Sequence, residues 1–320
     1  MGSFQQFEAA VQNITATEIE EKEKDIELNN PLAEAAVSAI KNALDKFLTE
    51  KQVKDIVQTE MLEFNCNREI TLVTPTETKP LPNEPRHYLF KEILETVNLT
   101  IPAALIGPAG SGKSTCCEQI AKALDLTFYL QNGVTGTHEL TGFVDAHGRY
   151  QTTPFREAFS KGGLILIDEV DTSEASALKW INTGLANGYA VFPDSGNPIK
   201  RHSSFRIVIA ANTFGTGADR LYVGANQLDA STLDRFCFFN FDYDEKMELI
   251  TAGNHKWVNR VQRLRRAADQ EKARIVISPR ASIHGAKLLS AGWKQEVVES
   301  RVIWKGIDQD LKERIQRRAA

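Results

Sequence analysis

The chain has 320 residues, of which 42% are hydrophobic and 25% are charged, and its formal net charge is −4. These values are ordinary for a globular protein of more than one domain, and they exclude a globally basic nucleic-acid coat protein. No apolar run approaches the roughly 18 residues of a membrane-spanning helix. The four cysteines include no Cys-x-x-Cys pair, and the first residues lack the features of a signal peptide. We therefore expect a protein of the reducing cytoplasm with no membrane contact.

Residues 1–85 form the first predicted region. The charged tract at residues 18–27 is typical of a solvated helix or of a partly disordered arm. Asn30-Pro31 is a helix start, and apolar residues follow it at helical spacing as far as Leu48. Several prolines then indicate a linker: Pro75, Pro80, Pro82 and Pro85. We expect a helical N-terminal extension, a linker, and a domain boundary near residue 80.

Residues 86–242 alternate short β-like runs with helical stretches. The predicted strands are residues 102–106, 126–130, 163–167, 205–211 and 236–241. Strands separated by helices pair in parallel through right-handed crossovers, so this pattern predicts a three-layer α/β core with a five-stranded parallel sheet. Residues 243–320 carry no further strand signal. Helices are predicted there at residues 244–268 and 279–292, followed by a charged tail.

A glycine-rich segment between the first predicted strand and a helical stretch fits the Walker A pattern. Its residues are Gly107, Pro108, Ala109, Gly110, Ser111, Gly112, Lys113, Ser114 and Thr115. Glycines let backbone N–H groups fold around phosphate oxygens, and the helix that follows directs its positive end at the same anion. The alternative is a chance glycine-rich turn, which the flanking strand and helix disfavour. We expect Lys113 to neutralise the phosphates of ATP and Ser114 to ligate Mg²⁺.

The third predicted strand ends in two carboxylates, Asp168 and Glu169, which is the Walker B arrangement. Successive residues at a strand end point in different directions, so the two acids can take separate tasks. Asp168 is the candidate Mg²⁺ ligand, and Glu169 is the candidate base that orients and polarises the attacking water. An Asp-Glu pair in a solvated loop is the alternative, and the apolar run before it argues for the site.

Three polar residues further along complete the candidate site. Asn212 ends the fourth strand, where its amide would help to position water if that strand lies between the first and third; otherwise it merely ends a strand. Arg235, at a helix end before the last strand, suits an arginine finger given to a neighbouring subunit, or else a surface pair with Asp234. Arg280, at a helix start, would fold over the γ-phosphate or is a surface charge.

Taken in this order and at these intervals, the residues resemble an AAA+ ATPase with its sensors and arginine finger. The resemblance covers about residues 86–292 and implies a P-loop NTPase core followed by a small helical lid. The connecting segments, residues 141–163 with Phe143 and residues 212–236, look like the MoxR/CobS branch, in particular CobS, the ATPase subunit of cobaltochelatase, and its phage-encoded relatives. The segment 189–204 resembles the pre-sensor hairpin of that clade.

This resemblance implies a homo-oligomeric, hexameric ring in which Arg235 completes the neighbour's site and Arg220 is a second residue able to reach across. His87 and Tyr88 lie where the adenine pocket of the family begins. Phe143 would project toward the pore or a partner, with a buried aromatic as the alternative. CobS relatives act with a separate von Willebrand A domain protein. Phage-encoded relatives place such a chain in the cytoplasm of a bacterium or of a phage-infected host.

A nucleic-acid motor is the competing function. Basic residues gather in the lid and in the tail: Arg260, Arg263, Arg265, Arg266, Lys272, Arg274, Lys312, Arg314, Arg317 and Arg318. Such clusters bind phosphate backbones when they line one channel. Their helical spacing favours a solvated helix face instead. A non-hydrolysing scaffold is a third alternative, which Glu169 and Arg235 disfavour.

Overall fold

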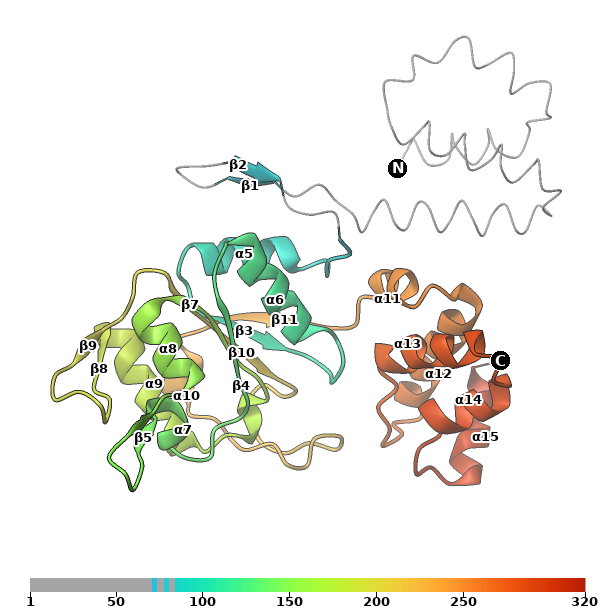
Figure 1. Ribbon diagram of the computed structural model, residues 1–320. Coiled ribbons are helices and arrows are strands. Elements are labelled where there is room, and N and C mark those ends of the chain that lie inside the picture. Colours follow the sequence, from blue (N-terminus) through green and yellow to red (C-terminus); the bar gives the residue numbers. More distant parts are fainter. Residues whose placement is uncertain (1–70, 74–77, 81–83, 320) are drawn as a thin grey trace, which may run out of the picture. The chain divides into compact units, whose positions relative to one another are not determined.

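A computed structural model describes residues 71–73, 78–80 and 84–319, and each of them belongs to the unit that spans residues 65–320 (Figure 1). The helix expected after Asn30 therefore lies outside the described residues. So do the charged tract before it and most of the predicted linker.

The predicted linker nevertheless contains a short pair of strands. Strands β1 (Thr71–Val73) and β2 (Thr78–Pro80) are antiparallel, with Thr71 opposite Pro80. The prolines that indicate the linker gave no sign of these two strands. The β-branched residues of β1 favour extended backbone, and proline is tolerated at a strand end.

The core of the fold is a five-stranded parallel sheet with the strand order β11-β3-β10-β7-β4. Its strands are β3 (Ala103–Ile106), β4 (Phe128–Gln131), β7 (Gly163–Ile167), β10 (Phe205–Ala211) and β11 (Cys237–Asn240). All five coincide with predicted runs to within two residues at either end. The fourth strand lies between the first and third, as the interpretation of Asn212 required.

The strand register brings three candidate segments to one edge of the sheet. Ala211 at the end of β10 lies opposite Ile106 at the end of β3, and Ile209 lies opposite Ile167 at the end of β7. The residues that follow these strands therefore emerge together, because the carboxyl ends of parallel strands share an edge. The Gly107 amide donates to the Ala211 carbonyl at 3.1 Å, which fixes the start of the glycine-rich loop.

Helices cover both faces of this sheet, which confirms the three-layer architecture (Figure 1). Helices α5 (Phe90–Asn98) and α6 (Lys113–Ala123) pack with Leu164 and Leu166 of β7. Helices α8 (Pro154–Lys161) and α9 (Ala175–Asn187) pack with the alternate residues of that strand. The strand is buried on both faces, which explains its continuous apolar sequence.

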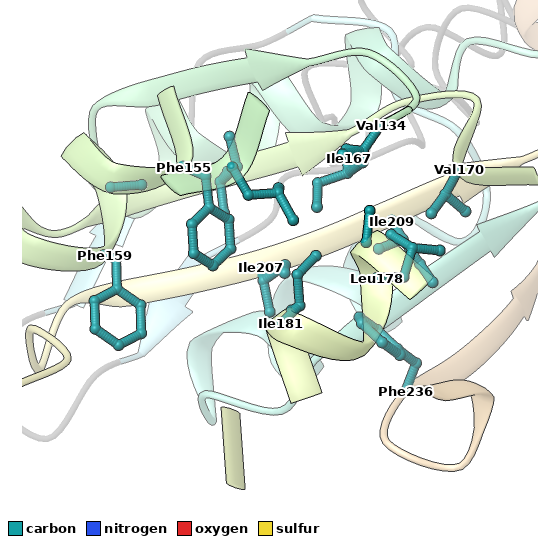
Figure 2. Packing of buried hydrophobic residues seen from close by; sticks show 14 of the residues in the cluster. Val134, Phe155, Phe159, Ile167, Val170, Leu178, Ile181, Ile207, Ile209 and Phe236 are labelled. Carbon is teal, nitrogen blue, oxygen red and sulfur yellow. The ribbon is translucent and has the colours of Figure 1, made fainter. Parts of the chain in front are cut away.

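Aromatic packing holds α8 on its side of the sheet, as Figure 2 shows for Phe155, Phe159, Ile181 and Ile207. The ring centroids of Phe155 and Phe159 are 6.0 Å apart, and both rings are fully buried. Replacing either ring with alanine is expected to cost about 3–5 kcal/mol. This aromatic layer therefore makes a large contribution to the stability of the sheet.

Several short elements connect the main strands. They are α7 (His138–Thr141), β5 (Phe143–Val144), β6 (Tyr150–Gln151), the 3-10 helix η1 (Val170–Thr172), β8 (Tyr189–Ala190), β9 (Ile199–Lys200) and α10 (Ala230–Leu233). Two hairpins, β5-β6 and β8-β9, occupy the segments singled out for their resemblance. Phe143 is 49% exposed, so the buried-aromatic alternative for this residue is wrong.

The C-terminal region is helical: α11 (Glu245–Ala252), α12 (His255–Gln270), α13 (Pro279–Ser290), α14 (Gln295–Val302) and α15 (Gln309–Arg318). The single helix predicted at residues 244–268 is therefore two helices. Gly253 takes the left-handed conformation with φ of 67°, and the Asn254 side chain caps the next helix by accepting from the Trp257 amide. In the described part of the chain, no helix is both long enough and apolar enough to cross a membrane.

The basic residues of this region are largely paired with acids. Arg265 is buried and donates to both carboxylate oxygens of Glu248, at 2.7 and 2.9 Å. Further ion pairs are Arg260–Glu299, Arg266–Glu245, Arg314–Glu271, Arg317–Glu313 and Arg318–Glu271. Interpreting Arg265 as part of a solvated face was wrong. Most of the predicted basic cluster is therefore engaged in ion pairs within the C-terminal helical region.

Candidate functional site

The glycine-rich loop joins β3 to α6 in a conformation that its glycines permit. Gly110 and Gly112 have φ values of 81° and 97°, in the left-handed region that other residues rarely adopt. Gly112 is the N-cap of α6 and offers no side-chain cap, so the first N–H groups of the helix have no side-chain partner there. A helix start of this kind is suited to binding an anion.

Lys113 begins α6 and points its ammonium back across the loop. Its Nζ donates to the Gly107 carbonyl at 2.7 Å, to the Pro108 carbonyl at 3.2 Å and to Asn212 Oδ1 at 3.2 Å. Burial lowers the pKa of Lys113, and the nearby carboxylates, Asp168 foremost, partly oppose that shift. The structure thus brings together a Walker A lysine and the amide expected to be sensor 1.

Ser114 and Asp168 meet directly, although they come from different elements. The Ser114 hydroxyl donates to Asp168 Oδ2 at 2.6 Å, while Asp168 Oδ1 accepts from the Glu169 amide at 2.9 Å. A hydroxyl and a carboxylate are oxygen ligands of the kind Mg²⁺ uses, with phosphate and water oxygens completing the shell. Among the described residues no group of three or more His, Cys, Asp or Glu side chains could hold a metal alone. The pair therefore fits Mg²⁺ that arrives with a nucleotide.

Glu169 is exposed and has φ of 52°, a conformation unusual for a residue with a side chain. It is the N-cap of η1, and its carbonyl accepts from the Thr172 amide at 2.9 Å and the Thr172 hydroxyl at 2.8 Å. Backbone strain of this kind clusters at functional sites, where the surrounding structure holds it in place.

Asp171 anchors the end of β10, and sequence reasoning missed it. Its side chain is 1% exposed, and its Oδ2 accepts from the amides of Asn212 and Thr213 at 3.0 Å each and from the Thr213 hydroxyl at 3.2 Å. These bonds fix the backbone that carries the Asn212 side chain. A carboxylate three residues after Asp168 was visible in the sequence, but its partners lie about forty residues further on.

Two tyrosines that sequence reasoning also missed hold Ala109 in the glycine-rich loop. The Ala109 amide donates to the Tyr222 hydroxyl at 2.9 Å, and the Tyr243 hydroxyl donates to the Ala109 carbonyl at 3.1 Å. The Arg265 guanidinium lies 4.4 Å from the centre of the Tyr243 ring. Tyr243 therefore connects the loop to the buried Arg265–Glu248 pair of the C-terminal helices.

The start of α13 approaches the same loop. A Cβ atom placed on Gly110 would lie 2.9 Å from the Ser278 side chain and 3.5 Å from Arg280 Nε. Arg280 is exposed, and its charge also contributes to the lowered pKa of Lys113, behind the larger effect of burial. The structure thus brings Arg280 beside the glycine-rich loop.

Three further candidates are Arg235, Arg220 and Thr115. Arg235 is half-buried, and its guanidinium donates to the Ser231 carbonyl one helical turn earlier. Arg220 is exposed in the loop before it, and Thr115 is exposed in the first turn of α6. Roles for these three residues stay predictions.

His87 differs from what was expected of an adenine contact. Its ring is 3% exposed and stacks on Phe241 with centroids 3.7 Å apart. Nε2 is hydrogen-bonded to the Asp242 carbonyl at 2.9 Å, and Nδ1 accepts from the Leu89 amide at 3.2 Å. Burial lowers the pKa of His87, in keeping with a neutral ring. Its nitrogens are engaged by backbone groups, whereas Tyr88 is 58% exposed and stays a candidate.

Sequence comparison identifies the domain that this site belongs to. Residues 102–236 match the AAA domain of the dynein-related subfamily, a stretch that runs from β3 to the residue before β11. The chain contains an AAA+ ATPase domain. Comparison with curated proteins found no match.

Among solved structures, the RuvB Holliday junction branch migration motor of Thermotoga maritima is similar, with a TM-score of 0.43 and 15% identity over 68% of this chain and 69% of that one. NtrX from Brucella abortus has a TM-score of 0.43 and 17% identity, over 82% of this chain and 58% of that one. Similarity this low says nothing about what the AAA+ domain acts on.

Proposed function

We propose that this protein is a Mg²⁺-dependent AAA+ ATPase that hydrolyses ATP to ADP and phosphate. The observation that carries the proposal is the 2.6 Å hydrogen bond between Ser114 Oγ and Asp168 Oδ2, beside an ammonium bonded to Asn212 Oδ1. Walker A, Walker B and sensor residues come from three separate strand ends, so chance adjacency does not account for their convergence. We further propose that residues 1–85 are an N-terminal extension, 86–242 the nucleotide-binding core and 243–320 the lid.

Each side chain has a task that its position supports. Lys113 and the free N–H groups at the start of α6 bind the triphosphate. Ser114 and Asp168 would hold Mg²⁺, which neutralises charge on the phosphate oxygens when it is bound. Glu169 accepts a proton from the water that attacks the γ-phosphorus, an effect worth about 10²–10⁴ in rate. Asn212, fixed by Asp171, orients that water, and Arg280 stabilises the γ-phosphate.

A matched pair of variants tests the assignment of the base. Glu169→Gln keeps the shape of the side chain but cannot accept the proton, so we expect ATP binding to persist and turnover to fall by at least a hundredfold. Glu174→Gln makes the same change at an exposed residue five positions later and should hydrolyse ATP like the native chain. Normal turnover by Glu169→Gln would remove Glu169 from this role.

We also propose that the active unit is a hexameric ring in which Arg235 reaches the neighbouring subunit's ATP, with Arg220 as a second candidate. An arginine supplied in this way is worth about 10³–10⁵ in turnover. Mixing Arg235→Ala subunits with Glu169→Gln subunits should restore activity at interfaces that pair an intact Glu169 with an intact Arg235. A mixture as inactive as both parents would argue against a shared site.

The resemblance to the MoxR/CobS branch supports a cytoplasmic ATPase that remodels a partner protein complex, with a separate von Willebrand A domain protein as the candidate partner. The exposed Phe143 and Val144 on the β5-β6 hairpin offer an apolar contact for it. With ATP bound, the Glu169→Gln variant should retain a purified partner of this class, and Phe143→Ser in the same variant should release it. Equal retention by both chains would exclude this hairpin from the contact.

A nucleic-acid motor is the second candidate, and the ion pairs of the lid weaken its original basis. It predicts that single- or double-stranded DNA stimulates ATP turnover and that the stimulation disappears at higher salt. Turnover that is indifferent to DNA at low salt would favour protein remodelling.

A further inference from the structure

A cavity of about 490 Å³ lies at the opposite end of the sheet from the glycine-rich loop. Phe205 and Ile207 at the start of β10 line it, as does Pro102 just before β3, whereas the loop follows the other end of β3. Its volume is within the range of small-ligand sites, roughly 300–1,000 Å³. Its polar lining consists of Thr100, Ser160, Lys200, Arg201, His202 and Ser203.

The charge of this lining has one sign. Lys200 and Arg201 supply two cations, and no aspartate or glutamate lines the cavity. Arg201 donates to the Leu185 carbonyl at 3.1 Å, and within the described residues neither it nor Lys200 forms an ion pair. In the lid, by contrast, the buried Arg265 is paired with Glu248. Because the chain has a net charge of −4, a group of cations without a neighbouring carboxylate is unusual in it and indicates an anion-binding site.

A second guanidinium, that of Arg206, is not part of the lining but is bonded to the backbone of Ser203, which is. Arg206 donates through Nη1 to the carbonyls of Ser203 and Phe205, at 2.9 and 3.0 Å, while its buried Nε has no hydrogen-bond partner among the described residues. Burial, followed by the charge of the nearby Arg201, lowers the pKa of Arg206. Two neighbouring guanidinium charges repel each other, and an anion bound at Arg201 would reduce that repulsion.

The adjacent hairpin presents an aromatic ring next to these charges. Tyr189 of β8 lies directly opposite Lys200 of β9, and directly opposed residues share a face of an antiparallel pair. Tyr189 is 48% exposed. Guanidinium, ammonium and hydroxyl groups together recognise phosphate, and an exposed ring beside them suits the stacking of a base.

We propose that this cavity is a second phosphate-binding site, distinct from the ATP site, which takes the phosphate of a nucleotide or of a nucleic-acid strand with its base against Tyr189. Lys200 and Arg201 bind the phosphate oxygens, and the hydroxyls of Thr100 and Ser203 complete the contact. Because the cavity lies at the other end of the strands, this site does not depend on hydrolysis at Glu169.

The test uses the full chain with its ATP site saturated by Mg²⁺ and a non-hydrolysable ATP analogue. Two probes are titrated: a fluorescent single-stranded deoxythymidine oligonucleotide, followed by anisotropy, and inorganic tripolyphosphate, followed by calorimetry. Lys200→Glu reverses one charge at an exposed position, and Lys256→Glu makes the same change on the surface of α12 as the control. We expect Lys200→Glu to weaken binding at least tenfold and Lys256→Glu to leave it unchanged.

The two probes distinguish the source of the phosphate. Binding of the oligonucleotide much more tightly than tripolyphosphate identifies a nucleic-acid strand, and comparable binding of both identifies a free phosphate compound. Arg201→Lys, which keeps the charge but loses the planar fork, should weaken the preferred probe severalfold even if Lys200→Glu proves unstable. The proposal is overturned if neither probe binds saturably, or if Lys200→Glu and Lys256→Glu bind equally. Failure of ATP binding itself would be seen separately with the analogue.

Discussion

Replacing Asp171 tests whether the positioning of Asn212 can be disturbed while nucleotide binding is kept. In Asp171→Ala, two backbone amides and one hydroxyl lose their shared acceptor in a site that is 1% exposed. Each buried donor left unsatisfied costs about 1–3 kcal/mol, so the three donors together correspond to a loss of roughly 3–9 kcal/mol, which is smaller where water enters. That is a large fraction of a typical stability of about 5–15 kcal/mol. Asp171→Asn keeps a carbonyl acceptor and should lose only about 1 kcal/mol.

The assay is urea denaturation followed by circular dichroism, combined with steady-state ATP hydrolysis. Because the Asp171 side chain is hydrogen-bonded to the backbone that carries Asn212, its loss should lower kcat about tenfold, equivalent to about 1.4 kcal/mol, while nucleotide affinity changes less. Asp171→Asn should recover most of both properties. If Asp171→Ala has the native urea midpoint and native kcat, the anchoring of Asn212 by this carboxylate is not what holds the strand end.

Three further predictions follow from contacts around the loop and the lid. Gly110→Ala places a Cβ atom 2.9 Å from the Ser278 side chain at a φ of 81°, which strains the loop by about 1–2 kcal/mol. We expect calorimetry to show about tenfold weaker binding of an ATP analogue. Unchanged affinity would mean that the lid moves aside freely. Arg265→Ala leaves buried Glu248 unpaired and should cost about 3–5 kcal/mol in urea unfolding, whereas Arg266→Ala, at an exposed pair, should cost no more than about 1 kcal/mol. Tyr243→Phe removes the hydroxyl that donates to the Ala109 carbonyl, which should destabilise the loop by about 1 kcal/mol. A fluorescent nucleotide should then be released faster in stopped flow, and an unchanged release rate would contradict a link between loop and lid.

The strands and the main site residues could be predicted from the sequence because their signals are local. Each of these strands is a continuous apolar run. Asp168 and Asn212 directly follow two such runs, and the glycine-rich loop that leads to Lys113 follows a third. Parallel pairing then brings them to one edge without further information. The interpretation of Asn212 required the fourth strand to lie between the first and the third, and the register of β10 with β3 and β7 meets that condition.

The residues that were missed depend on contacts between distant segments. Asp171 gains its role from amides at residues 212 and 213, and Tyr243 gains its role from Ala109, which precedes it by more than a hundred residues. Neither partner can be inferred from periodicity or from a short motif. Two differences lie within single elements and have local causes. The helix predicted at residues 244–268 includes Gly253, which in the structure ends the first of two helices. The prolines near β1 indicated a linker and gave no strand signal.

The central claim is that the loop around Lys113 binds a nucleoside triphosphate, and calorimetric titration of the full chain with ATP and Mg²⁺ tests it most directly. We expect saturable binding by the native chain and loss of at least a hundredfold in affinity for Lys113→Ala, with unchanged circular dichroism to show that the variant is folded. Native-like ATP affinity in the folded Lys113→Ala chain would contradict the account of this site.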